Sequence, residues 1–308
     1  MNHPSKPPRR RIDGVLLLDK PPGMTSNAAL QKAKRLLNAA KAGHTGTLDP
    51  MATGLLPICF GEATKFAGEL LAADKRYAAT VRLGVRTDTA DAEGRITQTR
   101  PVAVTREQVE AALARFRGDI LQVPPMHSAL KRDGKPLYEY ARQGIELERT
   151  PRTVSVHALD LRAFAEDRLE FDVSCSKGTY MRTLAQDIGE VLGCGGHLTA
   201  LRRTRIGNLD LESAITLDAL EALPAESRHA LLQPADALLA GLPMLGLDEA
   251  AAQRFSHGQA VPAGEGSPAG QWRVYAADGR FLGLGRTDLD GRVAPVRLVA
   301  TTIEKAGS

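Results

Sequence analysis

The sequence predicts an α+β protein with a large N-terminal domain and a small β-rich module at its C-terminal end. Over residues 12–245, short apolar or alternating runs typical of strands are interspersed with amphipathic segments typical of helices. From about Leu247 onward, the turn sequences AADGR and DLDGR separate the strand-like runs WRVY, FLGLG and VRLV. A chain of 308 residues is long enough to form both parts.

These patterns divide the chain into four segments. Residues 1–11 form a basic, proline-rich tail for which we expect disorder. The first domain is predicted over residues 12–245 and the β-rich module over residues 246–303, followed by a short tail at residues 304–308.

The charged residues are unevenly distributed. The formal net charge is +4, and the four basic residues of the N-terminal tail account for all of it. A nucleic-acid surface would therefore have to come from local clusters, each of which could equally be a solvated face. The three clusters are the tail KPPRRR, residues 131–152, and the arginines Arg202, Arg203 and Arg205.

The cysteines and the N-terminal residues indicate in which cellular compartment to expect the protein. The three cysteines form no CxxC pair, which favours a reduced cytoplasmic protein. The basic N-terminus is followed by an apolar run of only four residues. We therefore expect neither a signal peptide nor a membrane span.

In the first third of the chain, two apolar runs at residues 15–18 and 55–61 predict buried strands. Between them, Ser26 is the predicted N-cap of an amphipathic helix that covers residues 26–40. Residues 62–72 are predicted to be helical, and residues 75–84 alternate as a half-buried strand does.

Farther along the chain, residues 84–94 form a polar loop whose acids lack the spacing of an EF-hand. Thr105 and Gln108 form a capping-box signature for a helix that runs to Phe116. Residues 124–150 are polar and basic and predict a protruding arm.

The remaining elements of the first domain are two strands at residues 153–164 and 168–176 and a helix that begins near Tyr180. Three glycines at residues 193, 195 and 196 end this helix. Residues 198–207 predict a strand or a short helix, and residues 211–245 predict short helices.

The sequence GHTGTLDPMATG at residues 43–54 has the composition of a shaped loop, and Asp49 is its only carboxylate. Glycine permits unusual backbone conformations, and Pro50 biases Asp49 away from the helical region. The loop can therefore hold one acid in a fixed pose. A threonine-rich turn that merely joins two elements is an equally good explanation of this stretch taken alone.

The surroundings of Asp49 narrow the chemistry of such a site. No HxxxH or carboxylate cluster accompanies His44, and no glycine-lysine-serine or glycine-lysine-threonine ending marks a phosphate loop. An aspartyl-phosphate enzyme would need an acid where Met51 stands. A metal-free carboxylate remains, acting as nucleophile or base. Arg182 is the predicted cationic partner, and we expect it to lower the pKa of Asp49.

At this point the chain resembles the TruB family, the bacterial tRNA pseudouridine synthases that modify uridine 55 in the T-loop. Four blocks carry the resemblance, in the order of the family and over most of residues 14–205: GVLLLDKPPGMTSN, AGHTGTLDPMATGLLPICFGEATK, DKRYAATVRLGVRTDTADAEG and CSKGTYMRTLAQDIGEVLGCGGHLTALRRT. Residues 246–303 resemble a PUA-like RNA-binding domain more loosely. The resemblance implies a pseudouridine synthase fold with a mixed, largely antiparallel sheet flanked by helices.

The resemblance also implies roles for individual residues. Asp49 matches the catalytic aspartate and Arg182 the arginine paired with it, while Lys20 and Pro21 match the motif that braces the catalytic loop and, for Lys20, a substrate-binding position. The positions that match contacts to the target nucleotide are His44, Tyr77, Tyr180 and Leu201, with Tyr77 also implied in proton transfer. Taken singly, each of these side chains could be an ordinary packing residue. We expect Lys131, Arg132 and Arg142 of the arm to contact phosphates.

The expected reaction requires the target base to leave its stack and enter a pocket. Asp49 would attack ribose C1′ or uracil C6, or assist removal of the C2′ proton, and the residues do not choose among these routes. An isomerisation without redox or net hydrolysis demands no cofactor. We expect a monomer that binds the T-arm of tRNA without a membrane or an obligatory protein partner. The alternatives are a guide-RNA-dependent relative and an RNA-binding or tRNA-folding factor without chemistry.

Overall fold

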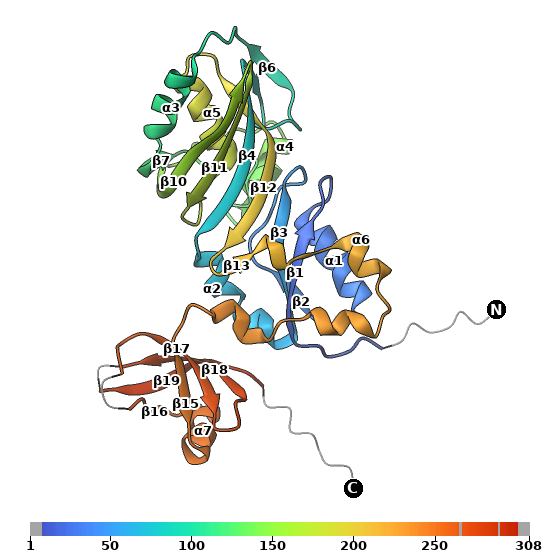
Figure 1. Cartoon of the computed structure of the whole chain (residues 1–308), viewed down its shortest axis with the longest axis vertical. Coiled ribbons are helices and arrows are strands. Elements are labelled where there is room, and N and C mark those ends of the chain that lie inside the picture. The colour runs from blue at the N-terminus through green and yellow to red at the C-terminus, as the bar shows by residue number, and fades with distance from the viewer. Residues whose placement is uncertain (1–7, 265–266, 289, 301–308) are drawn as a thin grey trace, which may run out of the picture.

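The computed structural model describes residues 8–264, 267–288 and 290–300. Within them, the larger sheet has ten strands, in the order β14-β1-β3-β12-β4-β11-β10-β7, with β2 beside β3 and β13 beside β12 (Figure 1). The strands are β1 Gly14–Lys20, β2 Ala42–His44, β3 Thr53–Phe60, β4 Lys75–Leu83, β7 Gly118–Gln122, β10 Arg152–Ala165, β11 Arg168–Cys175, β12 Gly196–Ile206, β13 Leu209–Asp210 and β14 Ile215–Thr216. Only the β1–β14 and β3–β12 pairs are parallel, which confirms a mixed, largely antiparallel sheet.

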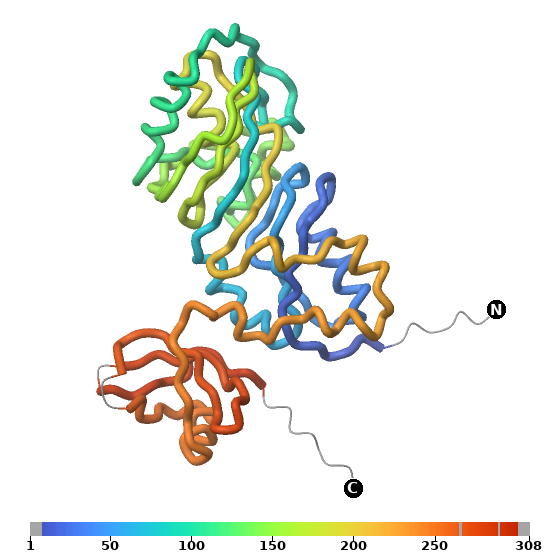
Figure 2. The backbone as a smooth tube through the Cα atoms, in the orientation of Figure 1, coloured from blue at the N-terminus to red at the C-terminus, as the bar shows by residue number. Residues whose placement is uncertain are grey.

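Helices cover this sheet in two groups, as the backbone tube in Figure 2 also shows. The α-helices of this part are α1 Ser26–Leu36, α2 Ala67–Ala72, α3 Arg106–Ala114, α4 Leu137–Arg142, α5 Met181–Val191 and α6 Leu217–Ala222. The 3₁₀ helices are η1 Gly61–Lys65, η2 Leu211–Ser213, η3 Ser227–Leu231 and η4 Ala235–Leu239. Helices α3 and α5 bury a core with β4, β10, β11 and β12, whereas α1 and α6 lie over β1 and β3.

Strand β1 shows why an apolar run without alternation forms a strand here. Leu16 and Leu18 pack with α1 and α6, while Val15 and Leu17 face the opposite side, toward Phe66. Both faces of β1 are therefore covered, so each position in the run is apolar.

The C-terminal module is a five-stranded sheet in the order β15-β17-β18-β19-β16. Its strands are β15 Met244–Leu247, β16 Val261–Pro262, β17 Gln271–Ala276, β18 Phe281–Thr287 and β19 Arg292–Leu298. The AADGR turn joins β17 to β18 as predicted. The sheet also carries a helix that we did not predict, α7 Glu249–Ser256, which is capped by the Asp248 carboxylate accepting from the Ala251 N–H at 2.7 Å. Phe281 of this module packs on Phe66 of the large domain, with ring centroids 5.4 Å apart.

The start of α1 corrects one prediction. The N-cap is Thr25, whose side chain accepts from the Ala28 N–H at 3.1 Å, and Ser26 is the first helical residue. Sequence alone did not distinguish two adjacent hydroxyl residues. The Ser26 side chain is buried and bonds elsewhere, to the backbone of Leu48.

Other local predictions stand or need adjustment. The capping box of Thr105 and Gln108 is confirmed, and the segment predicted as a strand or short helix at residues 198–207 is a strand, since residues 198–206 lie within β12. The predicted helix over residues 62–72 is divided at Phe66 into η1 and α2. The predicted loop at residues 84–94 contains a short strand, β5 Val85–Thr87, which pairs with β6 Ile96–Thr99.

The arm, residues 124–150, lies between β7 and β10. It holds a short hairpin whose strands, β8 Lys131–Arg132 and β9 Lys135–Pro136, have two residues each, and α4 follows. Asp133 and Gly134 make its turn with φ of 52° and 79°. No helix among the described residues is both long and apolar enough to cross a membrane.

Candidate active site

The loop at residues 43–54, hereafter the Asp49 loop, is held by the connection between β1 and α1. The Lys20 ammonium donates to the carbonyls of Pro21 at 2.8 Å, Met24 at 2.6 Å and Pro50 at 3.3 Å. The Ser26 hydroxyl donates to the Leu48 carbonyl at 3.1 Å and accepts from the Leu48 N–H at 2.8 Å. The backbone on both sides of Asp49 is therefore fixed by side chains from outside the loop.

Asp49 forms an ion pair with Arg182, as the sequence predicted. The Arg182 Nε lies 3.0 Å from Oδ2 of Asp49, and Nη2 lies 3.5 Å from Oδ1. The Arg182 side chain is only 7% exposed, whereas that of Asp49 is 38% exposed. The arginine is thus buried behind the carboxylate, which keeps access to solvent.

Arg182 has further partners that fix its plane. Nη1 donates to the Thr89 carbonyl at 3.3 Å, and Nη2 donates to the His127 carbonyl at 2.6 Å. His127 belongs to the first turn of the arm, so Arg182 links the base of the arm to the Asp49 loop.

A second carboxylate, Asp91, was missed by the sequence analysis, which treated its segment as a polar loop. Its Oδ2 lies 3.5 Å from Nε of Arg182, and its side chain is 4% exposed. Its Oδ1 accepts from the Thr89 hydroxyl at 2.6 Å and from the Glu93 N–H at 3.0 Å. The available signal was the resemblance block itself, TDTADAEG, in which Asp91 lies among other acids.

The pKa of Asp49 departs from the expectation. Burial raises it above the ordinary value, Arg182 opposes this shift, and the Asp91 carboxylate adds to it. We expected a net decrease from Arg182 alone. The direction is reversed because the cost of burying the charged carboxylate, together with repulsion from Asp91, outweighs the attraction of Arg182.

Burial raises the pKa of two tyrosines, Tyr77 and Tyr180, and the negative charge of Asp49 adds to the shift of both. Tyr77 is half-buried on β4, packed against the core below α5. Tyr180 immediately precedes α5. Its backbone N–H donates to Oε1 of Gln122 at 3.0 Å, and its carbonyl accepts from Nε2 at 3.4 Å. Gln122 is a buried positioning residue that sequence reasoning did not identify.

Leu201 and His44 lie on different sides of the Asp49 loop. Leu201 is buried on β12 and lines a cleft of about 400 Å³ together with Met51 and Thr53, the residues that follow Asp49. His44 ends β2, and its Nδ1 is buried without a hydrogen-bond partner among the described residues. Burial and the nearby Arg203 lower the pKa of His44, which favours the neutral imidazole.

The basic residues predicted to contact RNA occupy two kinds of place, exposed positions on the arm and one buried position. Lys131, Arg132 and Arg142 are exposed on the arm. Lys20 has 0% exposure and is occupied by three carbonyls, so its predicted substrate contact is corrected to a bracing position. Its burial lowers its pKa to about 8.

The arginines of LRRTRIG do not form an exposed patch. Arg202 pairs with Asp19 through two bonds of 3.1 and 2.7 Å, and Arg205 lies 3.3 Å from Asp210. Arg203 points inward and is 1% exposed. Alternation along β12 separates Arg202 from Arg203, and a register irregularity lies between Arg203 and Arg205.

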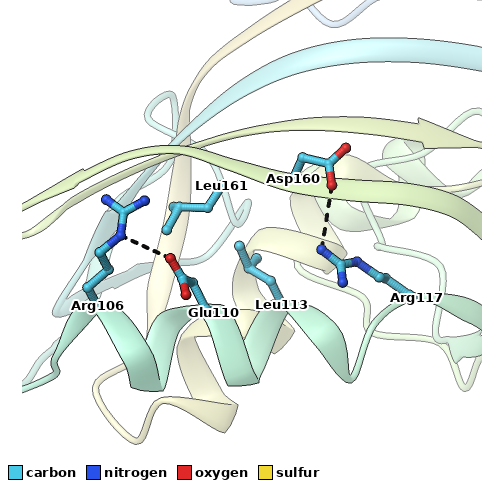
Figure 3. A pocket seen from close by; sticks show the side chains of 6 residues that line it. All are labelled: Arg106, Glu110, Leu113, Arg117, Asp160 and Leu161. Carbon is cyan, nitrogen blue, oxygen red and sulfur yellow. Dashed lines mark hydrogen bonds and ion pairs between the residues drawn. The ribbon is translucent and has the colours of Figure 1, made fainter.

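A second cavity, away from Asp49, has charged side chains in its lining. It lies between α3 and β10, has a volume of about 360 Å³, and is lined by Arg106, Glu110, Leu113, Arg117, Asp160 and Leu161 (Figure 3). Its charged groups are paired with one another, Arg106 with Glu110 at 2.9 Å and Arg117 with Asp160 at 3.5 Å. Within the described part of the chain, no three His, Cys, Asp or Glu side chains are grouped to hold a metal ion.

Family models match most of the chain. Residues 34–181 match the N-terminal domain of the TruB family pseudouridylate synthases. Residues 182–240 match the tRNA pseudouridylate synthase B C-terminal domain, and residues 243–299 match the C-terminal model of pseudouridine synthase II TruB.

Curated relatives cover nearly the full length. The chain is 62% identical over 293 residues to tRNA pseudouridine synthase B of Aromatoleum aromaticum, covering 95% of this chain and 94% of that protein. It is 60% identical over 299 residues to the protein of the same name from Burkholderia mallei, covering 95% and 99%.

Solved structures share the fold. An archaeal box H/ACA sRNP Nop10–Cbf5 complex matches with a TM-score of 0.71 at 27% identity, covering 94% of this chain and 86% of the other. A Cbf5–Nop10–Gar1 complex matches with a TM-score of 0.69 at 29% identity, covering 89% and 78%. With its sequence matched along almost its whole length and its fold shared, this chain belongs to the TruB family of pseudouridylate synthases.

Proposed function

We propose that this protein is a tRNA pseudouridine synthase that isomerises uridine 55 in the T-loop, with Asp49 as its catalytic carboxylate. The family and the names of its 60–62% identical relatives support pseudouridine synthesis in tRNA. The observation that carries the assignment to Asp49 is its pairing with the buried Arg182, at 3.0 Å, in a loop braced from outside.

The polar groups around Asp49 suit a flipped nucleotide. Extruding a base costs a few kcal/mol, which a pocket recovers through stacking and hydrogen bonds. Tyr77 supplies an aromatic ring beside Asp49, Tyr180 a second ring, and Leu201 an apolar contact. His44, whose buried Nδ1 has no hydrogen-bond partner among the described residues, lies at the start of the loop that carries Asp49.

In this proposal Asp49 reacts with the nucleotide, and Arg182 stabilises the charge of its carboxylate. The reaction breaks the bond from ribose C1′ to uracil N1 and forms a bond from C1′ to C5, so the carboxylate must be ionised when it acts. Burial raises the pKa of Asp49, and Arg182 offsets part of that shift. Arg182 therefore helps to keep the carboxylate ionised, while the 38% exposure of the Asp49 side chain leaves it open to the nucleotide.

The RNA backbone would be bound by the arm and by the PUA-like C-terminal domain. Lys131, Arg132 and Arg142 are exposed and available for phosphates. Because His127 of the arm contacts Arg182, RNA held by the arm lies against the site. We place the protein in the cytoplasm with its tRNA substrate, which suits its three free, buried cysteines.

A guide-RNA-dependent enzyme is the second candidate, because the matching structures are Cbf5 complexes. Their identity to this chain is 27–29%, against 60–62% for relatives named as tRNA enzymes. We therefore favour a monomer that acts on tRNA without a guide or a protein partner.

The test uses purified protein and an unmodified tRNA transcript labelled with tritium at uracil C5, since forming the C1′–C5 bond releases that hydrogen. We expect release without guide RNA, and none from a transcript with cytidine at position 55. Asp49→Ala should abolish release while tRNA binding persists. Release from the cytidine transcript would contradict the position, and an active Asp49→Ala variant would refute the residue assignment.

A further inference from the structure

Arg203 occupies the junction of three strands of the site. On β12, it pairs in parallel with Gly54 of β3 and in antiparallel register with Tyr77 of β4. The strands approach closely, because a Cβ on Gly54, whose φ is 98°, would lie 2.3 Å from the Arg203 carbonyl oxygen. Only glycine fits there. The backbone of Arg203 therefore joins the end of the Asp49 loop to the strand that carries Tyr77.

The side chain of Arg203 makes the same connection. Its Nε donates to the Leu55 carbonyl at 2.8 Å, and its Nη2 donates to the Gly46 carbonyl at 3.1 Å. Gly46 lies within the Asp49 loop, three residues before Asp49. On the neighbouring strand, Tyr77 lies directly opposite Arg203 in the antiparallel register, so the two side chains share one face of the sheet.

The guanidinium of Arg203 is buried, and no carboxylate among the described residues pairs with it. Arg203 is 1% exposed, and no salt bridge to it occurs among the described residues. A buried charge without a counter-ion is costly, so partly charged oxygens must stabilise it. Two of these are the carbonyls of Leu55 and Gly46, and the register places the side chain of Tyr77 opposite the guanidinium.

Arg203 also affects the protonation of its neighbours. Burial raises the pKa of Tyr77, and Arg203 opposes that increase by favouring the phenolate. The same cation lowers the pKa of His44. Two residues of the proposed nucleotide pocket therefore respond to one buried charge.

We propose that Arg203 is a positioning residue of this site, which holds the Tyr77 hydroxyl and the Gly46 segment of the Asp49 loop in one arrangement. An arginine is required because its fork of donors can serve two carbonyls and a phenol at once, which an ammonium on a single stem cannot reproduce. With a guanidinium donor on its oxygen, the Tyr77 phenol keeps its own proton free for the nucleotide. The significance of this contact for catalysis rests on the proposed function, whereas the contact itself does not.

The kinetic test is a double-mutant cycle in single-turnover tritium release. Arg203→Lys should lower the rate about 10- to 100-fold with tRNA affinity within about threefold, because the residue is buried and misplacement of a reacting group carries such a cost. In a Tyr77→Phe background, the same change should lower the remaining rate by a smaller factor, because the Tyr77 part of the arrangement is already lost and only the contact with Gly46 remains to be disturbed. Equal effects in both backgrounds would overturn the proposal. Arg205→Lys, on the same strand but exposed and paired, is the matched control.

A titration without RNA tests the contact separately. In protein labelled with 3-fluorotyrosine, the fluorine resonance of Tyr77 is assigned by its loss in Tyr77→Phe. Arg203→Met should raise its titration midpoint by about one pH unit or more, and Arg205→Met should leave it unchanged. An unmoved midpoint overturns the proposal even if the enzyme is active. A moved midpoint in a protein that forms no pseudouridine would reject the function and retain the contact.

The melting temperature of Tyr77→Phe provides a third test, which needs neither a folded Arg203 variant nor an active Tyr77→Phe enzyme. Tyr77→Phe removes one oxygen that stabilises the buried guanidinium, so its melting temperature should fall by about 2–6 °C. An unchanged melting temperature would show that the phenol is not a partner of Arg203.

Discussion

The Asp49 loop and the arm are both connections within one sheet, yet they are held in opposite ways. The Asp49 loop is fixed by buried side chains from outside it, namely Lys20, Ser26, Arg182 and Arg203. The arm is tied to the site at its base by the contact of His127 with Arg182, and beyond the base its bonds are internal, such as Arg132 donating to the Glu148 carbonyl at 3.1 Å. Beyond the base, its basic side chains are exposed.

This difference suggests a division of labour. A reacting carboxylate must be held to a fraction of an ångström, which requires supports whose own positions are locked by burial. A segment that grips the phosphates of an RNA gains from exposed, adaptable side chains. We therefore expect substitutions in the supports of the Asp49 loop to affect rate and stability, and substitutions on the arm to affect affinity.

The largest effect should come from Arg182→Met. The change leaves Asp49 and Asp91 without their shared cation, so like-charge repulsion and burial raise the pKa of Asp49 further. Single-turnover release of tritium should fall at least about 10³-fold at pH 7.5, a loss typical of a group that acts as a unit with the nucleophile.

The control for this prediction is tRNA affinity, measured by filter binding. It should change less than about fivefold, because Arg182 is buried behind Asp49. A loss of affinity as large as the loss of rate would show that Arg182 binds RNA and that the two regions are not functionally separate.

Ser26→Ala should have the next largest effect. It removes both side-chain bonds to Leu48, so we expect a loss of about 1–3 kcal/mol in the free energy of unfolding and a rate about tenfold lower. Thr25→Ala is the matched comparison, since it removes a helix N-cap at a cost of about 1 kcal/mol without touching the loop. If both variants lose the same rate, the loop is not what Ser26 supports.

We expect the free energy of unfolding to depend on pH through the protonation of the buried Lys20. Its folded pKa of about 8 lies below the value of about 10.4 for an unfolded lysine, so the unfolded chain binds more protons between these values. The free energy of unfolding should therefore rise with pH across this window, by about 1–3 kcal/mol relative to Lys20→Met, and the penalty is fully present below pH 8. Urea titrations at pH 7, 8, 9 and 10 measure the difference, and parallel curves for the two proteins would contradict it.

The smallest effect should come from Lys131→Ala on the arm. Loss of one phosphate contact should weaken tRNA binding about three- to tenfold and reduce the slope of log affinity against log salt by about one. The melting temperature and the rate on saturating tRNA should stay unchanged. A changed rate at saturation would mean that the arm also positions the reacting groups.

The features of the fold that depend on neighbouring residues in the sequence could be predicted. The strand at residues 15–18 and the capping box at Thr105 depend on neighbours in sequence, and both were found. The helix α7 was missed because the hairpin turns around it dominated the pattern, although Asp248 carries an N-cap signature. Choosing Ser26 over Thr25 was wrong because two hydroxyls compete and burial decides between them.

By itself, the sequence determined the α+β class, the shaped loop around Asp49 and the choice of Arg182 as its partner, since periodicity, turn chemistry and motifs are written in neighbouring residues. Only the tertiary structure decided that Asp91 shares Arg182, that Lys20 is buried and that Arg203 is buried opposite Tyr77. These features depend on which side chains meet across strands far apart in sequence, and on how much water their packing leaves beside each charge.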